Sequence, residues 1–247
     1  MIHVVPVAGP VPYRAGLAWQ RVLARARISG ELDHDLVLLL EHAPVVTLGR
    51  GSDAGHVVAT PEALAAAGVD RVEIERGGDV TYHGPGQLVG YPILDLSGYR
   101  RDLHWYLRRL EDVLIRVLDE LGISAFRLPE YTGVWVGDAA VAADPVARAR
   151  GEARKIASIG VHVSRWVTWH GFALNLTREA VEGFGWIVPC GIDDVRMTCV
   201  EDEGGDGRLD TVRPLVAGAF AAAFDAPARL EAEVEAGGHL NFTERVA

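Results

Sequence analysis

The stretch RKIASIGVHVSRWVTWHGFALNL, residues 154–176, determines the fold that we expect for this chain. Two runs within it, 154–165 and 167–176, alternate large apolar side chains with small or polar ones. Alternation with a period of two is typical of a strand, and two such runs in close succession are typical of an antiparallel hairpin. The stretch therefore predicts two paired strands of a sheet.

Helical and extended patterns interleave on both sides of this hairpin. Several extended runs follow one another without a helix between them, which favours a mixed sheet over a strictly parallel one. The expected fold class is therefore α/β, with a mixed sheet and flanking helices. We predict helices at 13–28, 61–68, 102–122, 211–224 and, short and acidic, 226–236. We predict strands at 35–42, 44–50, 72–76, 79–84, 87–96 and 132–137.

The chain of 247 residues contains no recognisable linker and no internal repeat, so we expect a single domain over residues 1–247. Hydrophobic residues make up 49% of it, which is enough to fill a sizeable core. One stretch departs from the regular pattern. Residues 138–153 are polar and rich in alanine, which predicts a flexible, exposed loop.

Composition and charge exclude several classes of protein. No apolar run approaches the roughly 20 residues that cross a bilayer, and the N-terminus lacks the basic and apolar regions of a secretory signal. A net charge of −10 argues against non-specific nucleic-acid binding, which depends on neutralising phosphates. Two cysteines are too few for a disulfide scaffold. We therefore expect a cytoplasmic protein that binds neither nucleic acid nor membrane.

The segment RGGDVTYHGPGQ, residues 76–87, is richer in glycine than folding requires. Its glycines permit positive φ and let the backbone approach a ligand closely, although neither a dinucleotide fingerprint nor a P-loop is present. It predicts a binding loop about as well as a plain hairpin turn, and His83 alone is typical of a structural hydrogen-bonding group. The segment WHGFALNL, residues 169–176, predicts plain core when taken alone, but it also suits the wall of an acyl pocket.

Lys155 is the only lysine among the 24 basic residues of the chain. Arginine supplies permanent charge and ion pairs at least as well, but it does not lose its proton in a protein, whereas a buried or crowded lysine can. A sole lysine is therefore a candidate for proton transfer or amine chemistry. The alternative is a solvated residue that survived a general replacement of lysine by arginine.

The two cysteines differ in their surroundings. Cys190 lies between Pro189 and Gly191 in IVPCGI (187–192), at a tight bend that presents a thiol with little steric cover. The alternative is a small buried side chain, the usual state of a free cysteine, and Cys199 fits that description better. The sequence contains no paired CxxC, so we expect no metal site.

Taken in order, RGGDVTYHGPGQLVGYP (76–92), RKIASIGVHVSRWVTWHGFALNL (154–176) and IVPCGI (187–192) resemble the lipoyl(octanoyl)transferases. The likeness covers about residues 40–200, and the combination is specific although each piece alone is weak. Because this family has the biotin/lipoate protein ligase fold, the resemblance implies a mixed α/β catalytic domain with a central sheet. It also implies an acyltransferase that moves an octanoyl group from octanoyl-acyl carrier protein to a lysine of a lipoyl domain, the first step of protein lipoylation.

The resemblance also implies roles for individual residues. Cys190 looks like the nucleophile that accepts the acyl group as a thioester, and Lys155 looks like its general-base partner. A thioester donor is already activated, so the family reaction uses no ATP, metal or other cofactor. The implied substrate-binding residues are Arg76, Gly77, Gly78, Asp79, Val80, Thr81, Tyr82, His83, Ser158, Ile159, Gly160, Gly171, Phe172 and Ala173.

The partners that the resemblance implies are proteins. Octanoyl-acyl carrier protein is the donor, and the acceptors are the lipoyl domains of 2-oxoacid dehydrogenases and the glycine cleavage H protein. These partners are typically acidic while this chain carries −10, so docking requires local basic patches. Arg148, Arg150 and Arg154, close to Lys155 in the sequence, are the first candidates for such a patch.

Three alternatives stay open at the level of the sequence. An ATP-dependent lipoate or biotin protein ligase of the same fold uses a similarly placed lysine but needs no cysteine, so Cys190 favours transfer through a thioester. A non-catalytic relative would only bind acyl carriers or lipoyl domains, and the pair of Cys190 and Lys155 counts against it. A thioester hydrolase would use the same two residues to pass the acyl group to water.

Overall fold

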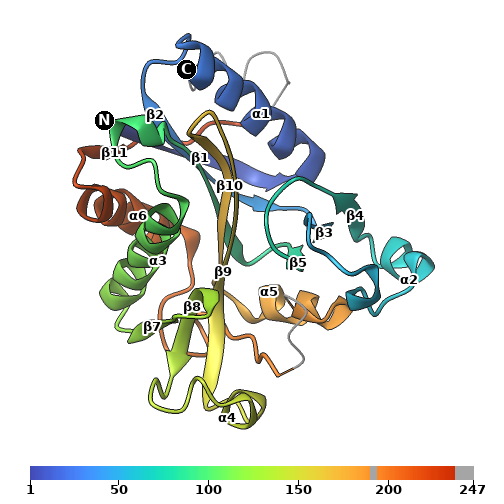
Figure 1. The fold of residues 1–247 in the computed structure, drawn as a ribbon. Helices are drawn as coiled ribbons and strands as arrows, with labels where there is room; N and C mark the ends of the chain where they lie inside the picture. Colours follow the sequence, from blue (N-terminus) through green and yellow to red (C-terminus); the bar gives the residue numbers. More distant parts are fainter. Residues whose placement is uncertain (190–193, 237–247) are drawn as a thin grey trace.

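A sheet of eight strands runs through the centre of the molecule, whose computed structural model describes residues 1–189 and 194–236 (Figure 1). Its innermost strands include the predicted hairpin, in which Gly160 faces Gly171. In spatial order the strands are β11 (Ala228–Leu230), β1 (Ile2–Val11), β2 (Asp35–His42), β6 (Gln87–Ile93), β10 (Val167–Asn175), β9 (Ala153–Ser164), β8 (Tyr131–Gly137) and β7 (Ala125–Leu128). β1 pairs in parallel with β2 and β11 and the remaining pairs are antiparallel, so the predicted mixed sheet is confirmed.

Three further strands form a small sheet beside the large one (Figure 1). They are β3 (Val45–Leu48), flanked by β4 (Asp70–Glu73) and β5 (Val80–His83). The sequence predicted all three as strands, but alternation identifies a strand without naming its partner. The small sheet has its own apolar cluster, which includes Val46, Leu48 and Tyr82, and it therefore packs as a separate layer.

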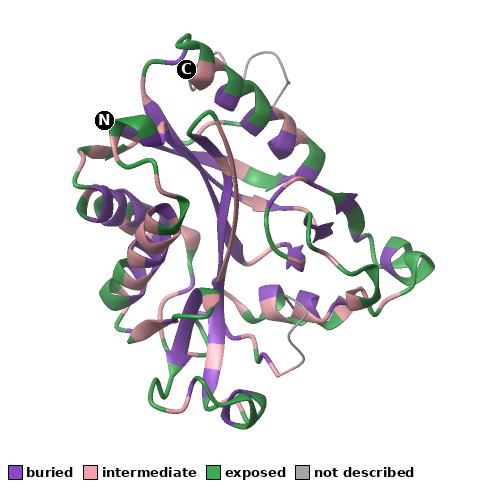
Figure 2. Ribbon diagram, in the orientation of Figure 1, coloured by how far each residue is buried: buried purple, intermediate pink, exposed green. Residues whose placement is uncertain are grey.

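Helices cover both faces of the large sheet (Figure 1). α3 (Leu103–Glu120) and α6 (Leu209–Phe224) pack on one face, and α1 (Tyr13–Ser29) packs on the other. β2 shows the consequence: Val37 and Leu39 enter the first core, while Leu36, Leu38 and Leu40 enter the second. Because both faces are covered, β2, β6 and β10 are buried along nearly their whole length, whereas β9 is half-buried from Ser158 onward (Figure 2).

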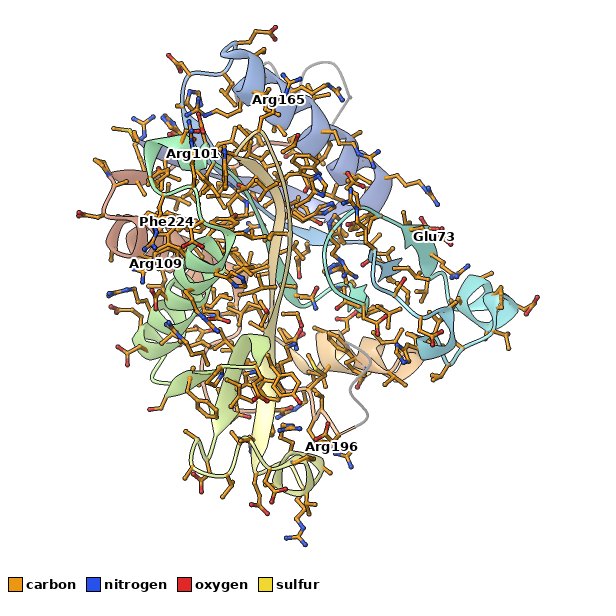
Figure 3. The ribbon with its side chains drawn as sticks, in the orientation of Figure 1. Glu73, Arg101, Arg109, Arg165, Arg196 and Phe224 are labelled. Carbon is orange, nitrogen blue, oxygen red and sulfur yellow. The ribbon has the colours of Figure 1, made fainter. Side chains whose placement is uncertain are left out.

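Aromatic rings join α3 to α6 near the end of α6. The Phe224 ring meets the Tyr99 ring at 5.6 Å and the Trp105 ring at 5.8 Å, both edge to face (Figure 3). Such pairs contribute about 0.5–1.5 kcal/mol beyond the area they bury. The remaining helical elements are short: α2 (Pro61–Ala66), α4 (Pro145–Ala149), α5 (Arg178–Glu182) and the 3₁₀ turns η1 (Ala54–His56), η2 (Leu96–Gly98) and η3 (Gly183–Trp186).

One prediction about local structure was wrong. The acidic helix expected at 226–236 is absent, and part of that stretch forms β11, because the outer edge of β1 offers backbone groups that need partners. Ile2 N donates to Pro227 O, and Glu231 N donates to Val4 O. The stretch 138–153, expected as a flexible, exposed loop, is exposed over most of its length. It also contains the short helix α4 and four buried residues, which are Ala142, Ala147, Arg148 and Ala153.

Across residues 1–189 and 194–236, none of the helices combines the length and the apolar character that crossing a membrane requires.

We predict that Leu110→Ala in α3 lowers the free energy of unfolding by about 2–5 kcal/mol, because it leaves a cavity in a core where Leu110 is fully buried. Val22→Ala on the exposed side of α1 is the matched control and should change the value by less than about 0.5 kcal/mol. Urea unfolding followed by circular dichroism measures both. Equal effects of the two substitutions would contradict the packing of α3 described above.

Candidate active site

A cavity of about 360 Å³ opens where the large sheet parts between β8 and β9. The two strands pair from Gly137 with Ala153 as far as Val134 with Ala157, and beyond that point none of the described strands lies beside the outer edge of β9. The glycine-rich loop takes the place of a strand there, since Gly77 N donates to Val161 O at 3.0 Å. The edge of β9, the loop and α3 thus enclose a space inside the fold.

Most of the residues proposed from the sequence to bind substrate line this cavity, and Lys155 lines it with them. The exception is Tyr82, whose side chain faces the other side of β5 and packs edge to face on Phe184 at 6.0 Å. Alternate residues of a strand point to opposite faces, so Thr81 and His83 can face the cavity only if Tyr82 does not. The lining residues from the proposed set are Arg76, Gly77, Gly78, Asp79, Val80, Thr81, His83, Ser158, Ile159, Gly160, Gly171, Phe172 and Ala173.

Cys190 lies outside the described residues. The chain on either side of the undescribed segment is attached to elements of the cavity. Before it, Val188 N donates to His56 O at 2.7 Å, and His56 Nδ1 in turn hydrogen-bonds Asp79 of the glycine-rich loop. After it, Arg196 O accepts a hydrogen bond from Lys155 N at 2.8 Å.

Lys155 is nearly fully buried, with 2% of its surface exposed, on the first half of β9. Its Nζ lies 5.6 Å from the centre of the Trp135 ring. The backbone of Lys155 is fixed to the segment that contains Arg196 and Thr198. Lys155 N donates to Arg196 O, and Thr198 N donates to Lys155 O at 3.0 Å. The side chain therefore has a defined position at one end of the cavity.

Gly133 creates the space that the Lys155 side chain occupies. A Cβ at this position would stand 2.7 Å from Lys155 Cε and 2.6 Å from Ala157 O, closer than real contacts allow. Its φ of +131° also favours glycine. The fully buried carboxylate of Glu111 holds this turn, since it accepts from Gly133 N at 3.2 Å and pairs with Arg108 at 2.6 Å.

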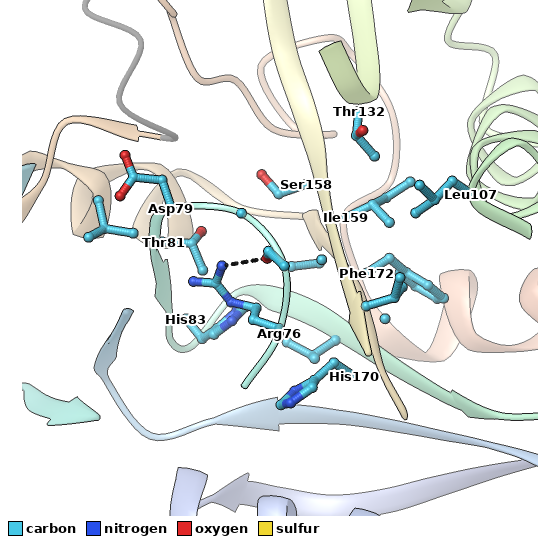
Figure 4. Close-up of a pocket in the computed structure, with 18 of the residues that line it drawn as sticks. Arg76, Asp79, Thr81, His83, Leu107, Thr132, Ser158, Ile159, His170 and Phe172 are labelled. Carbon is cyan, nitrogen blue, oxygen red and sulfur yellow. Dashed lines mark hydrogen bonds between the residues drawn. The ribbon is translucent and has the colours of Figure 1, made fainter. Parts of the chain in front are cut away.

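Arg76 fixes the glycine-rich loop to the small sheet. Its Nη2 donates to both Thr47 O and Thr47 Oγ1 at 2.9 Å, and its Nη1 donates to Gly77 O at 3.1 Å (Figure 4). The aliphatic part of the side chain lies over Gly160, where a Cβ would stand 3.0 Å from Arg76 Cδ. The residue lines the cavity, but these hydrogen bonds go to the protein itself.

A chain of hydrogen bonds fixes the tautomer of His83. Asn175 Nδ2 donates to Thr198 O, so Asn175 Oδ1 is the acceptor for Gln87 Nε2 at 2.9 Å. Gln87 Oε1 then accepts from His83 Nδ1 at 2.6 Å, which leaves His83 Nε2 as a lone-pair acceptor. Burial, together with the nearby His42, lowers the pKa of His83 to about 3, so the ring is neutral at neutral pH.

A second group of buried polar side chains lies beside His83. His42 Nδ1 donates to Val11 O at 2.8 Å, so its Nε2 accepts from the hydroxyl of Tyr91. Burial lowers the pKa of His42 to about 4 and raises those of Tyr13 and Tyr91 above their ordinary values, so all of these groups are neutral. Tyr13, His83 and Tyr91 therefore contribute polar but uncharged surface to the cavity.

Two further expectations have clear outcomes. Cys199 is fully buried, as its sequence context indicated, and burial raises the pKa of its thiol to about 11. Arg148 was expected in a docking patch, and this was wrong. Its guanidinium is 2% exposed and pairs with Asp194 at 2.7 Å, because α4 folds back onto the body of the protein.

The sequence interpretation did not single out several lining residues, among them Tyr13, Tyr91, Leu107 and Thr132. They come from elements that were predicted as plain core or as amphipathic helices. These residues reach the cavity through tertiary packing, which leaves no mark in a short window of sequence.

Comparisons with known proteins identify the family of this chain. The lipoyl protein ligase A/B catalytic domain family matches residues 12–221. An octanoyltransferase from Gloeobacter violaceus is 48% identical over 227 residues, covering 91% of this chain and 92% of that protein. One from Nostoc punctiforme is 44% identical over 216 residues, covering 87% of this chain and 86% of that protein.

Two solved structures share the fold. A lipoate-protein ligase A bound with ATP has a TM-score of 0.71 at 17% identity, covering 99% of this chain and 92% of that one. A bi-partite lipoate protein ligase from Thermoplasma acidophilum has a TM-score of 0.68 at 15% identity, covering 99% and 90%. At these identities the likeness establishes the architecture alone.

We predict that Gly133→Ala displaces the Lys155 side chain, because the added methyl group would overlap its Cε. Since Lys155 is the only lysine, intact mass after treatment with an amine reagent reports on it and on the N-terminus alone. Lys155 should react slowly in the wild type and several times faster in Gly133→Ala. The control Gly122→Ala adds a methyl at a positive φ of +77° with open space around it, and it should leave Lys155 as slow as in the wild type.

Proposed function

Because this chain belongs to the lipoyl protein ligase A/B catalytic domain family and is an octanoyltransferase, we propose that it transfers octanoyl from octanoyl-acyl carrier protein to a lipoyl-domain lysine through a thioester on Cys190. The observation that carries the proposal is the position of Lys155, the sole lysine, buried at the end of a cavity that the glycine-rich loop and the β9–β10 hairpin build. A cavity of about 360 Å³ falls in the range of small-ligand sites.

In the first half-reaction, the Cys190 sulfur attacks the carbonyl carbon of the octanoyl thioester. The bond from that carbon to the carrier sulfur breaks, and the carrier leaves as a thiol after taking up a proton. Lys155 accepts the proton from the Cys190 thiol and returns it to the departing carrier sulfur. The energy of the donor thioester is kept in the new one, so this step requires no adenylation.

In the second half-reaction, the amine of the acceptor lysine attacks the acyl group on Cys190. An amide bond forms, the bond to the Cys190 sulfur breaks, and the amine loses one proton, which Lys155 takes up and passes to the departing Cys190 sulfur, restoring its thiol. An arginine at position 155 would keep its positive charge and could not serve in either step. This difference explains why lysine persists at the one position where a proton must be exchanged.

The proposed partners are octanoyl-acyl carrier protein as donor and, as acceptors, the lipoyl domains of 2-oxoacid dehydrogenases and the glycine cleavage H protein, all in the cytoplasm. Among the three arginines considered for docking, Arg150 has an exposed side chain, whereas Arg148 is buried and Arg154 is bound by Glu203 at 2.7 Å. Arg150 is thus the one of the three that can meet an acidic partner directly.

We predict that the protein gains the mass of one octanoyl group when incubated with octanoyl-acyl carrier protein without ATP. The adduct should be absent in Cys190→Ser and should disappear when apo lipoyl domain is added. The matched control is Cys199→Ser, which alters a buried thiol of raised pKa and should still form the adduct. Intact-mass spectrometry follows all three proteins.

Two results would speak against the proposed transfer. An unmodified wild type that joins free octanoate to the lipoyl domain only with ATP would identify a ligase of the same fold. An adduct that decays in water at the same rate with and without lipoyl domain would identify a hydrolase.

We predict that Lys155→Arg lowers kcat for transfer by at least about 100-fold, because general acid–base catalysis typically contributes 10²–10⁴-fold and arginine retains the charge without the exchangeable proton. The thermal midpoint should be measured alongside, since Lys155 packs tightly against Gly133. Turnover near that of the wild type would reduce position 155 to an electrostatic role.

A further inference from the structure

The two ends of the cavity differ in chemistry (Figure 4). Ser158 and Thr132 lie at one end, and Lys155 also lines the cavity. Apolar side chains line the middle, and His170 lies at the opposite end. A site for an apolar chain therefore ends on a polar group. The apolar side chains of the middle are Leu107, Ile159 and Phe172. The end at which His170 lies also holds Tyr13, His83 and Tyr91.

His170 adopts a backbone conformation that is unusual for its residue type. Its φ is +56° inside β10, a left-handed value that strains a non-glycine residue and persists only where its surroundings impose it. Here the surroundings do impose it, because His170 N donates to Oε1 of the fully buried Gln20 at 2.8 Å. The strand is thus held in the geometry that places this imidazole at the end of the cavity.

The imidazole of His170 is buried without a hydrogen bond on either ring nitrogen among the described residues. Its nearest acceptor, Glu75 Oε1, is 3.9 Å away, and Glu75 is already bound by Arg21 and Trp169. Burial lowers the pKa of His170 to about 3, so the ring is neutral and presents one donor and one acceptor. Buried polar groups of this kind normally meet a ligand atom or a water molecule.

The distance along the hairpin matches an eight-carbon chain. Ser158 pairs with Ala173, and Val161 pairs with His170. We call these two cross-strand pairs the level of Ser158 and the level of His170; they are three residues apart along the strands, which is about 10 Å at roughly 3.3 Å per residue. An extended octanoyl group has seven carbon–carbon bonds and spans about 9 Å at roughly 1.25 Å per bond. A chain with its carbonyl at the level of Ser158 therefore ends at the level of His170.

We propose that His170 is the residue that limits the acyl chain to about eight carbons, by closing the apolar part of the cavity with a fixed polar ring. This inference rests on the proposed function, since it treats the cavity as the acyl site. A decanoyl chain would press two further methylene groups against the imidazole and against any water bound to it. The chain would then bury polar atoms without partners, which offsets the gain from burying the methylene groups.

His170→Gly tests the proposal with little risk to the fold, because glycine adopts positive φ without strain. We expect the ratio of kcat/KM for decanoyl- over octanoyl-acyl carrier protein to rise at least tenfold, on the scale by which one or two methylene groups are discriminated in apolar pockets. The matched control is Arg165→Gly, at the exposed turn of the same hairpin, where φ is +49° (Figure 3). It should leave the ratio within twofold of the wild type.

Binding of free fatty acids separates this inference from the proposed function. Thermal shifts with hexanoate to dodecanoate should fall off beyond eight carbons in the wild type and beyond ten or more in His170→Gly. That result without any transfer activity would support the His170 limit and refute the proposed transfer. A folded His170→Gly with the wild-type length profile in both assays would overturn the inference. Should that variant not fold, His170→Asn, which also tolerates positive φ, should show a smaller shift in the same direction, and no shift would overturn the inference as well.

Discussion

The separation of β8 from β9 beyond Ala157 is the constraint on which the rest of this structure depends. If β8 paired with β9 along its whole length, the backbone groups at that edge of β9 would be hydrogen-bonded to β8 and no room would remain for a ligand. The sheet instead parts at Gly133, whose positive φ turns the chain away and whose missing side chain leaves space for Lys155. A buried carboxylate, Glu111, stabilises this turn through the Gly133 amide. One glycine thus both opens the cavity and determines where its single lysine can lie.

The opposite wall is held by hydrogen bonds within the protein. Arg76 ties the glycine-rich loop to β3, and the loop closes over the free edge of β9 through Gly77. The chain of hydrogen bonds that runs from His83 through Gln87 and Asn175 ends on Thr198. The backbone N–H of Thr198 in turn donates to the carbonyl oxygen of Lys155. Polar groups on both walls are therefore fixed before any substrate arrives, and preorganisation of this kind is what makes electrostatic stabilisation effective.

The parts of this fold that sequence predicted are those with a local cause. Period-two alternation identified β9 and β10, and leucine spacing identified α3, because both patterns follow from burying one face. Tertiary context decided the rest. Residues 226–236 became β11 because the edge of β1 lay beside them, and Arg148 was buried because Asp194 pairs with it. Tyr13 and Tyr91 reach the cavity from distant elements, so no window of sequence could place them there. Cys190 remains a prediction from its PCG turn.

The likeness to a lipoate-protein ligase bound with ATP shows why fold alone cannot name the reaction. A ligase must activate a free acid, so it needs a site for a nucleotide as well as for the acyl chain. A transferase receives an acyl group that is already a thioester, so it needs only a nucleophile and a group that exchanges protons. In a chain that uses arginine for every other basic position, a lysine retained within a cavity is the side chain that the proposed transfer assigns to the second requirement. Under that proposal two side chains would decide the chemistry, and the surrounding sheet would hold the apolar chain and its thioester beside them.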